Sequence, residues 1–148
     1  MPGTRLVWFR NDLRSADNAA LLAAAAQGPV VGVYCHGPEQ WRRHDVGGPR
    51  AAFVGRCLAA LGDELEALGM PLRILATDTF EAAPEAIVAL ARSLAAEALH
   101  YNAEYPLNEA RRDEAVTAAC REAGVRCHRH HDTVVQPPGT VLTGDGST

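Results

Sequence analysis

Residues 6–14 read LVWFRNDLR, and residues 15–21 continue as SADNAAL. An apolar run of strand length therefore breaks into two arginines that bracket a carboxylate, and Asn18, a good helix N-cap residue, follows a few positions later. This transition from strand to helix predicts that the chain opens with the first β-α unit of an α/β domain.

The rest of the chain repeats this alternation. Short apolar runs of strand length are separated by longer segments with helical spacing of apolar residues. Strands are expected at residues 5–9, 30–35, 72–76, 98–102 and 125–128, and helices at about 18–27, 49–68, 84–94 and 108–123. The predicted fold class is α/β: a Rossmann-like, doubly wound, five-stranded parallel sheet with helices on both faces.

The second helix has the clearest apolar face. Its expected core side chains recur at helical spacing, and Gly69 closes the segment. They are Phe53, Cys57, Leu61, Leu65 and Leu68. From Asp132 onward, Pro and Gly forbid a regular element, so we expect one α/β domain over residues 1–131 and the start of an interdomain linker over residues 132–148.

Composition excludes several classes of protein. The chain has 148 residues, 47% of them hydrophobic and 22% charged, which fits one domain with a full core. A net charge of −4 argues against nucleic-acid binding by these residues alone. No apolar run reaches the roughly 20 residues of a membrane span, and no signal-peptide pattern is present, so we expect a cytoplasmic monomer with no membrane contact.

Several chemical motifs are missing. The chain has no GxGxxG, GxxxxGK[ST] or GxSxG pattern, which removes the usual dinucleotide, P-loop and hydrolase interpretations. Four scattered cysteines form no CxxC pair. Strand alternation would place His128 and His130 on one face and His131 on the other, so we expect no metal site.

Ligands of doubly wound sheets bind beyond the carboxyl ends of the strands. After the first strand, Arg10, Asp12 and Arg14 form either a charge-paired turn or a contact with a neighbouring domain. After the second strand, Trp41 and His44 occupy an expected loop. In one interpretation a planar ligand stacks on Trp41 and hydrogen-bonds to His44. In the other, Trp41 packs over the loop and His44 is solvated.

Asn108 and Glu109 stand at the start of the last predicted helix. One interpretation makes Asn108 the N-cap and Glu109 a first-turn acid that favours the helix dipole. The other is chemical: a carboxylate can accept two parallel N–H bonds from a planar edge such as guanidinium or a 2-aminopyrimidinone. The residues alone leave both open.

Several motifs occur together in an order that resembles class I DNA photolyases. They are the opening stretch, Gln40-Trp41 with His44, Pro49-Arg50, Tyr101-Asn102, residues 108–113, and Pro137-Pro138-Gly139 before Leu142-Thr143-Gly144. The chain thus resembles the N-terminal antenna-chromophore domain of the DNA photolyase and cryptochrome family, and most of all its folate-type branch. Asn11 and Ser15-Ala16 depart from the family pattern, which puts details of the first turn in doubt.

The resemblance implies a set of site residues and cofactors. Asn108 and Glu109 would hold the pterin ring of 5,10-methenyltetrahydrofolate, and Trp41 and His44 would make secondary contacts. A C-terminal helical domain, absent from these residues, would carry FAD and contact damaged DNA. It would also complete the folate site, so we expect these residues alone to bind folate weakly or not at all.

The function implied for the whole protein is light-driven DNA repair. Folate would harvest light and pass excitation to reduced FAD, which splits UV-induced pyrimidine dimers, a lyase reaction. The present residues would harvest light and hold no catalytic residue. The alternatives are a blue-light-sensing cryptochrome domain and an adenine-nucleotide-binding Rossmann-like domain, whose phosphate-binding glycines are missing here.

Overall fold

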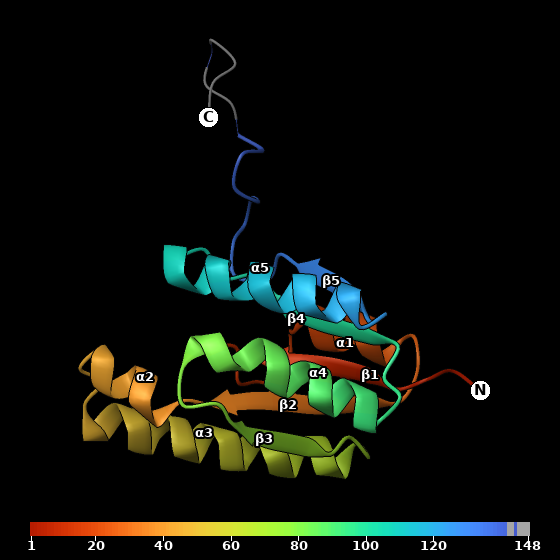
Figure 1. Ribbon diagram of the computed structural model, residues 1–148, viewed down its shortest axis with the longest axis horizontal. Helices are drawn as coiled ribbons and strands as arrows, with labels where there is room; N and C mark the ends of the chain where they lie inside the picture. The colour runs from red at the N-terminus through yellow and green to blue at the C-terminus, as the bar shows by residue number, and fades with distance from the viewer. Residues whose placement is uncertain (142–143, 145–148) are drawn as a thin grey trace.

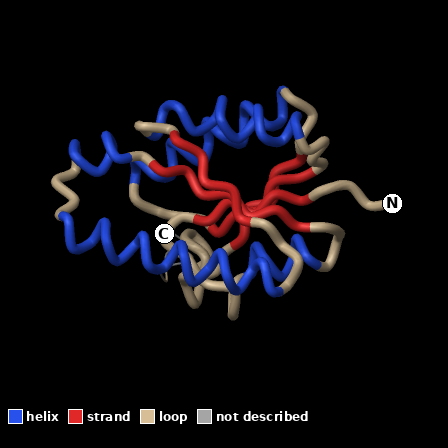
Figure 2. The backbone as a smooth tube through the Cα atoms, turned by 90° about the horizontal axis from the view of Figure 1, so that it is seen from below, coloured by secondary structure: helices blue, strands red, loops and turns tan. Residues whose placement is uncertain are grey.

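The computed structural model describes residues 1–141 and 144 and contains one parallel sheet of five strands. The strands lie in the order β3-β2-β1-β4-β5. They are β1 (Arg5–Phe9), β2 (Val30–His36), β3 (Leu72–Ala76), β4 (Ala98–Asn102) and β5 (Arg126–His130). The sheet lies between two layers of helices, as Figures 1 and 2 show, so the predicted fold class is confirmed.

The long helices divide between the two faces of the sheet. On one face, α1 (Ala19–Ala25) and α3 (Gly48–Ala67) cover the sheet, and on the other lie α4 (Ala83–Ser93) and α5 (Leu107–Glu122). Two short elements follow strand ends: α2 (Pro38–Arg43) after β2, and the 3-10 turn η1 (Phe80–Ala82) after β3. Sequence reasoning assigned both short elements to loops.

The central strand β1 supplies side chains to both cores. Leu6 and Trp8 pack under α4 and α5, whereas Val7 and Phe9 pack under α1 and α3. All four are at most 1% exposed. A parallel strand that is covered on both faces must be apolar throughout, which explains the continuous run at the start of the sequence.

The apolar face predicted for α3 is only partly buried. Leu61 and Leu65 are buried, but Phe53 and Leu68 are each 60% exposed. The first turns of α3 run beside α2, beyond the end of the sheet, and Leu68 stands at the C-cap where the helix ends (Figure 1). The prediction was wrong at these two positions because helical spacing does not say how far the neighbouring sheet extends.

The segment after β5 leaves the domain without forming a helix or a strand over residues 131–141 (Figure 1). Leu142 and Thr143 of the expected LTG motif, with residues 145–148, lie outside the described residues. Among the helices that are described, none combines the length and the apolar character needed to cross a membrane.

Candidate ligand-binding site

A cavity of about 560 Å³ opens at the carboxyl ends of the first three strands. The ends of β1 and β2 contribute Trp8, Arg10, Tyr34 and Cys35 to its wall. Further walls come from η1, from α2 and α3, and from the first turns of α5. Its volume is in the range of small-molecule sites, and its position is the edge at which doubly wound sheets bind ligands.

Three of the four predicted site residues line this cavity. Trp41 lies in α2, His44 directly follows α2, and Glu109 lies in the first turn of α5, so the fold brings together residues 65 or more positions apart in sequence. Within the described part of the chain, the half-buried Glu109 makes no ion pair and no side-chain hydrogen bond. A carboxylate without a protein partner at a cavity wall is available to a ligand.

Asn108 is placed differently. It is exposed and is not among the residues that line the cavity. The N-cap of α5 is Pro106, and the helix begins at Leu107, so Asn108 lies inside the first turn. The N-cap interpretation of Asn108 is therefore wrong, because Pro106 already adopts the extended conformation that precedes the helix.

Trp41 and His44 each have a structural contact as well. The Trp41 ring packs edge-on against His36, with 5.2 Å between ring centroids. The backbone N–H of His44 donates to the carbonyls of Gln40 and Trp41 and closes α2, while its side chain is exposed. The short helix thus presents the indole of Trp41 to the cavity.

A buried network of charged residues lies next to the cavity. Arg10 donates to both carboxylate oxygens of Asp113, at 2.7 and 3.2 Å, and also to the carbonyl of Asn102. Arg112 donates to Glu104 at 2.5 Å and to Asp113 at 3.0 Å. The side chains of both arginines and of Asp113 are 7% exposed or less. The network ties β1 to α5.

The ion pairs overcome the cost of burial. Burial alone would raise the pKa of Glu104, but Arg10 and Arg112 outweigh it, and the pKa lies below its usual value. Burial would lower the pKa of Arg112, whereas Asp113 and Glu104 raise it above the usual value. Glu104 and Arg112 are therefore ionised at neutral pH. Sequence reasoning missed this network, because its only signal was that Arg112 and Asp113 follow Glu109 by one helical turn.

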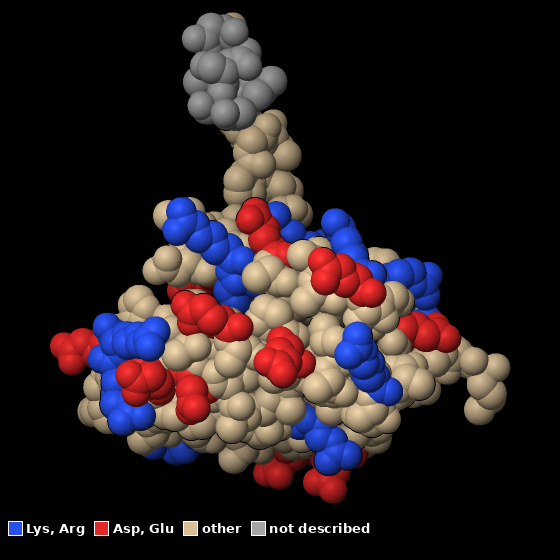
Figure 3. Space-filling model, viewed as in Figure 1, with Lys and Arg blue, Asp and Glu red and all other residues tan. Residues whose placement is uncertain are grey.

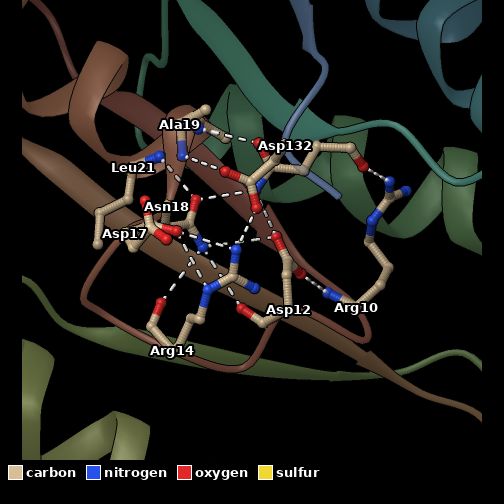
Figure 4. Close-up of polar contacts among 10 residues, drawn as sticks. Arg10, Asp12, Arg14, Asp17, Asn18, Ala19, Leu21 and Asp132 are labelled. Carbon is tan, nitrogen blue, oxygen red and sulfur yellow. Dashed lines mark hydrogen bonds and ion pairs between the residues drawn. The ribbon is translucent and has the colours of Figure 1, made fainter. Parts of the chain in front are cut away.

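The N-terminus of α1 is satisfied by side chains of the protein itself. Its first three backbone N–H groups each donate to a side-chain oxygen (Figure 4). The acceptors are Asp132 for Ala19 at 2.9 Å, Asn102 for Ala20 at 3.0 Å, and Asn18 for Leu21 at 3.1 Å. Free N–H groups at this position hold phosphate in dinucleotide-binding domains. Here they are not free, which argues against the adenine-nucleotide alternative.

The charged residues of the opening motif lie in the turn that leads into α1. Asp12 accepts from the backbone N–H of Arg10 at 2.8 Å and from the amide of Asn102 at 2.7 Å. Arg14 pairs with Asp132 (Figure 4). These side chains do hold the turn in place, but not by the expected local charge pairing, because both arginines pair with carboxylates more than 100 residues away.

Three histidines stack across the edge of the sheet. The His100 ring lies 4.6 Å from that of His128 and 5.3 Å from that of His130, measured between centroids. His100 Nδ1 and His130 Nε2 are 3.1 Å apart. His128 and His130 share a face, as strand alternation predicted, while His131 contacts Tyr105. Over residues 1–141 and 144, no group of His, Cys, Asp and Glu has the arrangement of a metal site.

The histidine stack predicts a loss of stability in mild acid. His100 is fully buried, and burial, with help from His128 and His130, lowers its pKa from 6.5 to about 4. The unfolded chain therefore binds more protons than the folded one between these values. This contribution to stability, about 3 kcal/mol, is present above pH 6.5 and is lost as the pH drops toward 4.

Urea unfolding at several pH values between 7.5 and 4.5 measures this effect. The slope of stability against pH should flatten in His100→Gln and persist in His44→Gln, whose side chain is exposed. An equal slope in all three proteins would show that His100 does not carry the effect.

Charge on the surface is mixed. On the face that carries α4 and α5, acidic and basic side chains are interspersed and form no field of one sign (Figure 3). Recognition of a nucleic-acid backbone uses clustered cations. This face therefore lacks the pattern of a DNA-binding surface.

The doubly wound sheet, the cavity at its carboxyl edge and the occupied N-terminus of α1 define a Rossmann-like domain without an open phosphate site at its first helix. The family model described as DNA photolyase matches residues 5–148, which is nearly the whole chain. The chain belongs to the DNA photolyase family.

The relatives include the deoxyribodipyrimidine photo-lyases of Vibrio cholerae and Escherichia coli, at 42% and 37% identity over 96% of this chain. The chain spans about 30% of the length of these relatives. A class III photolyase from Agrobacterium tumefaciens superposes with a TM-score of 0.77 at 28% identity, over 99% of this chain and 29% of that one. For an archaeal photolyase from Sulfolobus tokodaii the TM-score is 0.76 at 23% identity, over 95% and 32%, which shows the shared fold.

Proposed function

We propose that this chain is the light-harvesting domain of a DNA-repairing photolyase and that the cavity binds 5,10-methenyltetrahydrofolate. The observation that carries the proposal is Glu109: a carboxylate without a protein partner among the described residues, at the wall of a cavity of about 560 Å³. Family membership supplies the context.

The residues present suit a pterin ring. Its 2-amino-4-oxo edge offers adjacent N–H groups, and the Glu109 carboxylate can accept two of them in parallel. Trp41 offers a flat apolar surface, and His44 a nitrogen at the same cavity. Asn108 stays in the proposal as a contact to the part of the ligand outside the cavity. When bound, the folate would absorb near-ultraviolet and blue light and supply excitation energy.

The whole protein is proposed to repair UV-induced pyrimidine dimers in DNA through FAD held by a further, C-terminal domain. The length of the relatives implies such a domain, because this chain spans only about 30% of them. The residues from Asp132 onward would be the linker to it. Within the proposal, this chain holds the chromophore and is not itself catalytic, and the protein works in the cytoplasm as a monomer.

Titration of the full-length protein with methenyltetrahydrofolate, followed through the ligand's absorption band, tests the proposal. Glu109→Gln should weaken binding by about 10- to 100-fold, because it removes a charge-assisted pair of hydrogen bonds. The matched control is Glu114→Gln, an exposed acid of the same helix, which should bind like the wild type. Equal affinity of wild type and Glu109→Gln would remove the carboxylate from this role, and no binding by the full-length wild type would remove folate.

A flavin is the second candidate ligand. The Sulfolobus tokodaii photolyase is described with two FAD molecules and the implication of a novel light-harvesting cofactor. The wall of the present cavity contains Trp8, Tyr34 and Phe80, aromatic groups that also suit a flat tricyclic ring. Competition between FAD and methenyltetrahydrofolate for binding would show which of the two ligands the cavity prefers.

A sensory role, as in cryptochromes, is the other functional alternative. A cryptochrome from Synechocystis shares the fold, with a TM-score of 0.78 at 24% identity over 88% of this chain and 27% of that one. Light-dependent removal of pyrimidine dimers from DNA by the full-length protein would support the photolyase proposal. Light responses without repair would favour the sensory one.

A further inference from the structure

Two guanidinium groups lie over the ring of Trp8 in the cavity wall. The Arg10 Cζ atom is 4.2 Å from the ring centroid, and the Arg112 Cζ atom is 4.9 Å from it. All three side chains line the cavity, and Trp8 is only 1% exposed. Tryptophan is among the most easily oxidised side chains, so its place beside a light-absorbing ligand matters.

The two cations are held in place. Arg10 is fixed by both oxygens of Asp113, and Arg112 by Glu104 and Asp113. Each arginine also lies over a second aromatic ring, Tyr101 for Arg10 and Phe80 for Arg112. Because the groups are buried and paired, their charges stay close to the indole.

A cation over the face of an indole is attracted by the ring's π electrons. The same field opposes removal of an electron from the ring, because the resulting radical cation would face two positive charges at 4–5 Å. The effect is stronger than in bulk water because these side chains are buried, and the paired carboxylates of Asp113 and Glu104 offset part of it.

We propose that Arg10 and Arg112 suppress electron donation from Trp8 to a light-excited chromophore in the cavity. This inference rests on the proposed function, because energy transfer needs an excited state that survives. The suppressed step moves one electron from the indole to the chromophore and gives an indole radical cation and a chromophore radical anion. Return of that electron would release the absorbed energy as heat.

Two other oxidisable side chains of the wall are kept in their protonated forms. Burial raises the pKa of the Cys35 thiol to about 11 and also raises the pKa of the Tyr34 phenol. A protonated thiol or phenol gives up an electron less readily than a thiolate or phenolate. Trp41 has no guanidinium over its ring among the described residues. It is therefore best removed before Trp8 is studied.

The test uses the Trp41→Phe protein, in which Trp8 is the only tryptophan, since the chain has two. Arg112→Gln and Glu104→Gln are then added separately. Both break the same ion pair, but the first removes a positive charge and the second a negative one. Loss of this ion pair would change both variants in the same direction, whereas an electrostatic effect changes them in opposite directions.

The first readout is the fluorescence lifetime of bound methenyltetrahydrofolate. Arg112→Gln should shorten the lifetime at least twofold, Glu104→Gln should not shorten it, and Trp8→Phe added to Arg112→Gln should restore it. An unchanged lifetime in Arg112→Gln, or equal shortening in both variants, would overturn the inference.

The second readout needs no chromophore. Azide radicals produced by pulse radiolysis oxidise indole, and the indole radical is followed by its absorption. Relative to Trp41→Phe, oxidation of Trp8 should be several-fold faster with Arg112→Gln and slower with Glu104→Gln. Glu104→Gln alone decides the matter if Arg112→Gln does not fold, because a rate equal to or above the parent contradicts the inference. If the full-length protein does not bind folate, the proposed function is wrong, whereas the azide-radical measurement on this chain still tests the field at Trp8.

Discussion

Replacing Asp113 by alanine is expected to lower the free energy of unfolding by about 3–5 kcal/mol. Asp113 neutralises Arg10 through two hydrogen bonds and also pairs with Arg112, and all three side chains are nearly inaccessible to water. Without the carboxylate, a buried guanidinium would remain uncompensated. The melting temperature should fall by roughly 10 °C for a domain of this size.

Thermal and urea unfolding of the Asp113→Ala protein measure the effect. The control is Glu39→Ala, which removes an acid that pairs with Arg42 at 3.1 Å on the surface. Such exposed pairs contribute about 0–1 kcal/mol. If Asp113→Ala lost as little stability as Glu39→Ala, Arg10 would have to be solvated or paired elsewhere at no cost in free energy.

Asn102→Ala is expected to lower the free energy of unfolding by about 2–3 kcal/mol, because the Asn102 amide hydrogen-bonds both to α1 and to the turn before it. The carbonyl oxygen accepts from the N–H of Ala20 in α1, and the NH₂ group donates to Asp12 at 2.7 Å and to Asn18 at 2.8 Å. Truncation would leave the Ala20 N–H unpaired in the interior, and the Asp12 carboxylate oxygen would keep only a long contact, 3.5 Å, from the amide of Asn18. Buried groups without partners are costly.

Unfolding in urea measures the global loss, and hydrogen exchange of the Ala20 amide measures the local one. Exchange at Ala20 should accelerate more than exchange in α4, which Asn102 does not contact. The same substitution at the exposed Asn108 should change stability by less than about 0.5 kcal/mol. Equal effects at the two asparagines would contradict the role assigned to Asn102.

The strands β1 and β4 could be predicted from sequence because they are buried along their whole length. The bounds of β1, β3 and β4 agree with their apolar runs. β5 is an edge strand of alternating polar residues, and its bounds, Arg126–His130, differ from the predicted residues 125–128. Likewise, the spacing of Phe53 in α3 indicated a buried face that the sheet does not reach.

The candidate site was partly predictable for a different reason. The rule that ligands bind at the carboxyl ends of parallel strands led to Trp41, His44 and Glu109, and all three line the cavity. The Arg10–Asp113 pair could not be foreseen, because its partners are 103 residues apart and no local pattern links them. Neither could the position of Arg112 over Trp8.

The contacts of Asp132 have a mechanical consequence. Its carboxylate holds both the N–H of Ala19 and the side chain of Arg14, immediately after the edge strand β5 ends. A pulling force applied through residues 133–141 would first break these two contacts of Asp132. Only then would it separate β5 from β4, one hydrogen bond at a time. The domain should therefore yield at Asp132 under load, while the cavity at the carboxyl ends of β1, β2 and β3 keeps its shape.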